Sequence, residues 1–82
     1  MSKNIVTVYS AKWCGACGPF KESLNRAGIE YKEVDMDDEN ATKEAFKLGI
    51  RNLPTTTVHA PDGTLLLIQA GSGAIPLIKK YL

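Results

Sequence analysis

The two cysteines of this chain, Cys14 and Cys17, lie two residues apart in the segment Trp13-Cys14-Gly15-Ala16-Cys17. Sulfur atoms at this spacing can close a small disulfide ring, or open it, without displacing the rest of the fold. A bridge over so short a loop removes little entropy from the unfolded chain, so it would stabilise the fold only slightly. The spacing therefore predicts reversible thiol–disulfide exchange, with Cys14 and Cys17 as a redox-active disulfide.

The two sulfurs are expected to have different roles, because a helix is predicted to begin at the cysteine pair. Cys14 would be the nucleophile, since free N–H groups and the dipole at a helix N-terminus stabilise a thiolate. Cys17, one turn further in and more shielded, would resolve the mixed disulfide. Lys12 either adds a positive charge or is an ordinary solvated lysine. Pro19 either kinks a helix that begins at Cys14 or restarts it after an irregular turn.

Metal binding and an inert buried pair are the alternatives to redox chemistry. Tetrahedral zinc needs four ligands, and the chain adds only one histidine, His59, to its two cysteines. A metal ion or cluster would therefore have to be shared between two chains. We expect no metal and no cofactor, and we expect His59 to be a structural residue on a strand.

The hydrophobic pattern places the cysteine pair directly after the first of four strands. β-Branched or alternating segments predict strands over residues 5–9, 29–35, 55–59 and 65–69. Helices are predicted from the cysteines to a stop at Gly28, from an acidic start at 37–40 to a stop at Gly49, and over 74–82. The first two helices have the following candidate core residues: Phe20, Leu24, Ala27, Ala41, Ala45, Phe46 and Leu48.

The resulting order, β-α-β-α-β-β-α, predicts one α/β domain spanning residues 1–82. A crossover helix joins the first two strands, so they should be parallel with a right-handed connection. The turn at Pro61-Asp62-Gly63 predicts an antiparallel hairpin for the last two strands. We expect a mixed four-stranded sheet with helices on both faces.

Composition narrows the classes of partner. The net charge is +1 and the charged residues are mixed along the chain, so nucleic acid is not expected. The longest apolar run, residues 65–68, is too short to span a bilayer, and residues 1–4 lead into a strand without a signal-peptide core. We therefore expect a cytoplasmic protein, and we expect it to be a monomer. In the reducing cytosol an isolated C-x-x-C is usually catalytic or metal-binding.

The element order and the cysteine motif together resemble the thioredoxin and glutaredoxin superfamily over nearly the whole chain. The motif Trp13-Cys14-Gly15-x-Cys17 is similar to the thioredoxin form, whereas the compact length resembles that of glutaredoxins. Residues 49–55 resemble the segment that carries the cis-proline of the superfamily. The resemblance implies a thioredoxin fold and a cis bond at Pro54, which would present the backbone of Leu53 to an extended substrate.

Four departures from the superfamily pattern are visible in the sequence. Ala16 stands where thioredoxins have proline, and residues 5–10 contain no acid to match the buried aspartate of thioredoxins. Residues 71–74 contain no carboxylate of the kind with which glutaredoxins bind glutathione. Residues 34–37 resemble the glutaredoxin-like electron donors to ribonucleotide reductase, but the aromatic-rich C-terminal motif of those donors is absent.

The sequence therefore predicts a protein disulfide reductase, a dithiol electron carrier that acts on client protein disulfides. Cys14 and Cys17 would be catalytic, and Trp13, Leu53 and Pro54 would bind substrate. For Trp13, packing in the core is an equally weighted alternative to contact with substrate. A flavin-dependent reductase would re-reduce the disulfide of the protein. The alternatives are a glutathione-dependent glutaredoxin or an electron donor to ribonucleotide reductase and, from another class, a metal- or cluster-binding module.

Overall fold

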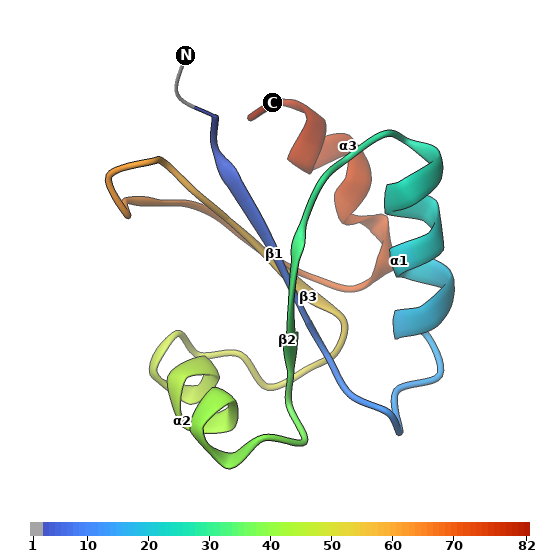
Figure 1. Cartoon of the computed structure of the whole chain (residues 1–82), viewed down its shortest axis with the longest axis vertical. Coiled ribbons are helices and arrows are strands. Elements are labelled where there is room, and N and C mark those ends of the chain that lie inside the picture. Colours follow the sequence, from blue (N-terminus) through green and yellow to red (C-terminus); the bar gives the residue numbers. More distant parts are fainter. Residues whose placement is uncertain (1–2) are drawn as a thin grey trace.

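The computed structural model describes residues 3–82 and has a single four-stranded sheet with the strand order β2-β1-β3-β4. β1 pairs in parallel with β2, whereas the β1–β3 and β3–β4 pairs are antiparallel. The predicted mixed sheet and the predicted element order are therefore confirmed (Figure 1). The strands are β1 (Ile5–Ser10), β2 (Lys32–Asp35), β3 (Thr55–His59) and β4 (Leu65–Ala70); the helices are α1 (Cys17–Arg26), α2 (Glu39–Lys47), the short 3-10 helix η1 (Ser72–Ala74) and α3 (Ile75–Lys79).

Helices cover both faces of the sheet, as predicted (Figure 1). The larger core lies between one face and helices α1 and α3; its buried residues are Val6, Val8, Phe20, Leu24, Ile29, Val58, Ala74 and Ile78. A smaller cluster of Tyr9, Ala45 and Ile50 packs α2 and the following loop against the other face. No helix in residues 3–82 is long and apolar enough to cross a membrane.

The two central strands position the cysteine loop and the proline segment at the same edge of the sheet. β1 and β3 are antiparallel, and Tyr9 near the end of β1 is paired with Thr55 at the start of β3. The cysteine loop follows β1 and Pro54 directly precedes β3, so both leave the sheet where these two strands meet. Segments about forty residues apart in sequence are thereby brought to one place.

Helix α1 begins at Cys17, so the prediction of a helix starting at Cys14 was wrong, and the alternative of an irregular turn before the helix is found. The cysteines are joined instead by a turn, in which the Cys14 N–H donates to the Ala11 carbonyl (3.1 Å) and the Cys17 N–H to the Cys14 carbonyl (3.3 Å). Pro19 then falls at the third position of the helix, where no intrahelical N–H donor is needed. A helix that started earlier would have had this proline in its interior, which explains why α1 begins only at Cys17.

Several predicted boundaries and core positions were also wrong. β2 is shorter than the predicted strand at 29–35, and α3 is shorter than the predicted helix at 74–82. Ala27, Phe46 and Leu48 are exposed, because α1 ends before Ala27 and α2 packs on the sheet through Ala45. The two predicted glycine stops are confirmed: Gly28 (φ 72°) and Gly49 (φ 77°) have the left-handed backbone that favours glycine.

Candidate active site

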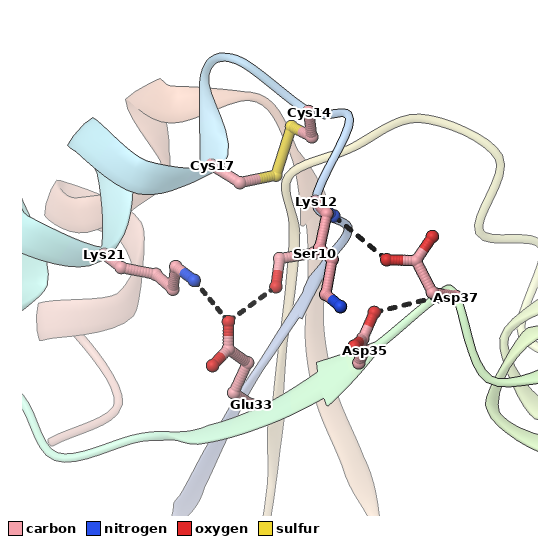
Figure 2. A network of polar contacts seen from close by, with 8 residues as sticks. All are labelled: Ser10, Lys12, Cys14, Cys17, Lys21, Glu33, Asp35 and Asp37. Atoms are coloured by element: carbon pink, nitrogen blue, oxygen red, sulfur yellow. Dashed lines mark hydrogen bonds and ion pairs between the residues drawn. A yellow bond between two sulfur atoms is a disulfide. The ribbon is translucent and has the colours of Figure 1, made fainter.

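Cys14 and Cys17 form a disulfide at the N-terminal end of α1, with their Cα atoms 5.5 Å apart (Figure 2). The two residues differ in exposure, since Cys14 is half-buried and Cys17 is only 2% exposed. The sulfur of another molecule can reach Cys14 from solvent, whereas Cys17 is shielded. This difference fits an attacking role for Cys14 and a resolving role for Cys17.

The start of α1 provides the electrostatic setting of both sulfurs. Cys17 is the first residue of the helix, and the disulfide holds the Cys14 sulfur at the same end. The Cys17 N–H is already bonded to the Cys14 carbonyl, and Pro19 has no N–H. Within residues 3–82, the Gly18 N–H makes no hydrogen bond. This free N–H group and the helix dipole can therefore both stabilise a thiolate.

Trp13 is 72% exposed, so the alternative that it packs in the core was wrong. Its indole ring forms an apolar surface in the segment that carries Cys14. Lys12 is also exposed, and its side chain points away from Cys14 (Figure 2). Its backbone N–H donates to Asp37 Oδ2 (3.1 Å), which fixes the loop before the cysteines to the segment after β2.

The peptide bond between Leu53 and Pro54 is cis, as the resemblance implied. Pro54 is buried and its carbonyl accepts a hydrogen bond from the Gly71 N–H (2.8 Å), which ties the end of β4 to the start of β3. The half-buried side chain of Leu53 packs on the cluster beneath α2. Among the described residues, no hydrogen bond uses the N–H or the carbonyl of Leu53, so both groups are free to bind an extended chain.

A polar cluster near the disulfide was missed by the sequence analysis. Glu33 on β2 accepts a hydrogen bond from Ser10 Oγ on β1 (2.7 Å) through the same oxygen that pairs with Lys21 Nζ on α1. Figure 2 shows this cluster on the same side of the sheet as Cys17. The three side chains line a groove of about 250 Å³. The first strand contains no acid, but the parallel register places Glu33 of β2 opposite Val8 of β1, so the acid comes from the neighbouring strand.

The interaction with the Lys21 ammonium group, followed by the Ser10 hydrogen bond, holds the pKa of Glu33 below its ordinary value of 4.5. A carboxylate with a lowered pKa in the folded state stabilises the fold above its ordinary pKa, and this contribution is lost as the pH falls through the lowered value. We therefore expect Glu33→Gln to lower the free energy of unfolding at pH 7 by less than about 1 kcal/mol, because the pair is partly exposed. The difference from the parent should vanish in acid.

Urea unfolding at a series of pH values between 7 and 2 measures this effect. Glu30→Gln is the matched control, because Glu30 is exposed and makes no ion pair within the described part of the chain. A Glu33→Gln variant that tracked the parent protein at every pH would contradict the prediction.

His59 lies half-buried at the end of β3. The described residues contain no group of three or more histidine, cysteine, aspartate or glutamate side chains that could hold a metal ion.

Comparison with known proteins gives consistent results from sequence and structure. The profile of the Glutaredoxin family matches residues 6–59. A protein of Mycobacterium tuberculosis whose name places it provisionally among the glutaredoxins is 36% identical over 64 residues, which cover 74% of each chain. A glutaredoxin of Ricinus communis is 28% identical and covers 92% of this chain and 91% of its own. Thioredoxin f from spinach chloroplast superposes with a TM-score of 0.79 at 19% identity, covering 98% of this chain and 74% of its own, which supports a common fold.

Proposed function

This chain belongs to the glutaredoxin family, a group of redox proteins with the thioredoxin fold, and we propose that it reduces disulfides of client proteins through Cys14 and Cys17. The observation that carries this proposal is the unequal burial of two bonded sulfurs at a helix N-terminus. One sulfur is accessible for attack, and the other is shielded but already within bonding distance of the first.

The proposed reaction has two exchanges. In the dithiol form, the Cys14 thiolate attacks one sulfur of the client disulfide, and the other client sulfur leaves as a thiolate that takes up a proton. The Cys17 thiol then loses its proton and attacks Cys14, the bond between Cys14 and the client breaks, and the second client thiolate leaves. The client disulfide gains two electrons, and the Cys14–Cys17 disulfide forms.

We propose that the client chain binds in an extended conformation beside Leu53. The free N–H and carbonyl of Leu53 can pair with a client backbone as an added strand would. The exposed indole of Trp13 offers an apolar contact next to Cys14. Backbone pairing does not depend on client sequence, so this mode of binding suits a reductant with many clients.

The Cys17→Ser variant tests the order of the two exchanges. We expect it to accumulate a covalent complex with a disulfide-containing protein such as insulin, because Cys14 can attack but nothing resolves the product. Non-reducing gel electrophoresis and intact mass measurement would detect the complex, which a thiol reductant should release. Cys14→Ser is the matched control and should form none. A trap formed by Cys14→Ser instead of Cys17→Ser would reverse the assigned roles.

A second candidate, re-reduction by glutathione, is favoured by the match to the Glutaredoxin profile and by the identity to the Ricinus communis glutaredoxin. Against it stands the lack of a carboxylate in residues 71–74. Steady-state reduction of insulin, with either glutathione and its reductase or a flavin-dependent thioredoxin reductase as the electron source, separates the two. We expect turnover with the flavin-dependent enzyme; turnover with glutathione alone would assign the second candidate.

A further inference from the structure

The second exchange requires a thiolate at Cys17, a residue that is buried. Cys17 is 2% exposed and precedes the buried core residue Phe20 by three positions on α1, and burial disfavours a charged sulfur. Burial therefore opposes the stabilisation that the N-terminus of α1 gives to a thiolate at Cys17, and a nearby positive charge would favour the ionised sulfur.

Lys21 is the cation that the fold places nearest to this sulfur along α1. It lies four residues after Cys17 in the same helix, a spacing that puts two side chains on one face with Cβ atoms about 5–6 Å apart. The Lys21 side chain is only 29% exposed, because it pairs with Glu33 and does not extend into solvent. Figure 2 shows its ammonium group on the side of α1 that faces Ser10 and the disulfide.

We propose that the Lys21 ammonium group stabilises the Cys17 thiolate that resolves the mixed disulfide, and that Glu33 and Ser10 are positioning residues that hold this ammonium group near the sulfur. This inference rests on the proposed disulfide exchange. When the Cys17 thiol releases its proton to solvent, the thiolate that remains is paired with Lys21 until it bonds to Cys14.

The other charges around Cys17 do not replace Lys21. Lys12, from the loop before the cysteines, lines the same groove, but its side chain points away from the disulfide (Figure 2). β3 begins with three threonines, which carry no charge. The acids that face the groove, Glu33 and Asp35, both come from β2. The Lys21 ammonium group partly offsets the charge of the Glu33 carboxylate, which also accepts a hydrogen bond from the Ser10 hydroxyl.

Alkylation of Cys17 in the Cys14→Ser background tests the role of Lys21 without any client. We expect Lys21→Met to raise the pH midpoint of iodoacetamide modification by about one pH unit. The reaction at neutral pH would then be roughly tenfold slower. Lys21→Arg should restore the midpoint, because it keeps the charge. Lys47→Met, an exposed lysine on α2, is the matched control and should change nothing. An unchanged midpoint in Lys21→Met would overturn the proposal.

The positioning role of Glu33 is measured with a double-mutant cycle in the same background. In Lys21→Met, Glu33→Gln can act only by removing a negative charge, and it should lower the alkylation midpoint. With Lys21 present, Glu33→Gln also releases the ammonium group, so the midpoint should fall less or rise. Equal shifts in the two backgrounds would show that Glu33 does not position Lys21. Circular dichroism of each variant checks that α1 is intact.

These measurements separate the two proposals. A normal Lys21 effect together with a Cys17→Ser variant that traps no client would reject the disulfide reductase function alone. A functional trap together with an alkylation midpoint that ignores Lys21 would reject only the role of Lys21.

Discussion

Replacing Cys14 with serine is expected to abolish the reduction of protein disulfides. The hydroxyl of serine is not ionised at neutral pH and cannot bond to a client sulfur, so neither exchange can begin. The buried Cys17 cannot substitute, because it is 2% exposed and has no access to a client disulfide. The rate of insulin reduction, followed by turbidity with a coupled reductase, should fall to the level measured without the protein.

The controls for this variant must separate chemistry from folding. Serine is close in size to cysteine and position 14 is half-buried, so the fold should persist. The proper reference is the parent protein with its disulfide reduced, since the variant cannot form the bridge. Matching circular dichroism spectra and unfolding midpoints would confirm that comparison. Full activity in a folded Cys14→Ser protein would refute the proposed mechanism.

Replacing Leu24 with alanine is expected to have the largest effect on stability. Leu24 is completely buried on α1, where it packs in the larger core against β1, β3 and α3. Such a truncation loses the burial of the side chain and leaves a cavity, at a cost of about 2–5 kcal/mol. Domains of this size have a total stability of about 5–15 kcal/mol, and small ones are marginal. Leu24→Ala should therefore be partly unfolded near 37 °C.

The matched control is the same substitution at an exposed leucine. Leu65 on β4 is 41% exposed, so Leu65→Ala removes less buried area and should cost below about 1 kcal/mol. Urea unfolding of the oxidised proteins gives both values under the same conditions. Similar losses for the two variants would mean that α1 is not held by the core as described. The cysteine loop depends on that packing, because Cys17 is the first residue of α1.

The parts of the fold that the sequence predicts well are those with local signals. The strand at Thr55–His59 is found at the predicted residues, because a β-branched run lies between clear breaks. The start of α1 was misplaced, because the effect of Pro19 depends on whether the cysteine turn is helical, and no local pattern decides that. Phe46 looked like a core residue from its helical spacing, but the short α2 covers too little of the sheet to bury it.

The candidate site likewise contains some residues that the sequence indicates and others that only the tertiary structure reveals. Cys14 and Cys17 were evident from spacing, and the cis bond at Pro54 followed from the resemblance. Glu33 and Lys21 were not evident, because they lie twelve residues apart on different elements and meet only through the pairing of β1 with β2. The register of a parallel pair depends on the crossover helix between the strands, and therefore on tertiary packing.

The antiparallel pair formed by β1 and β3 bears on how the reactive loop responds to thermal motion. Both strands have neighbours on each side, so their amide hydrogens should exchange with deuterium only in rare, near-global openings. Fraying of the chain ends or of the outer strands would then leave the positions of Cys14 and Pro54 relative to each other unchanged. The geometry on which electron transfer depends would persist for almost as long as the protein remains folded.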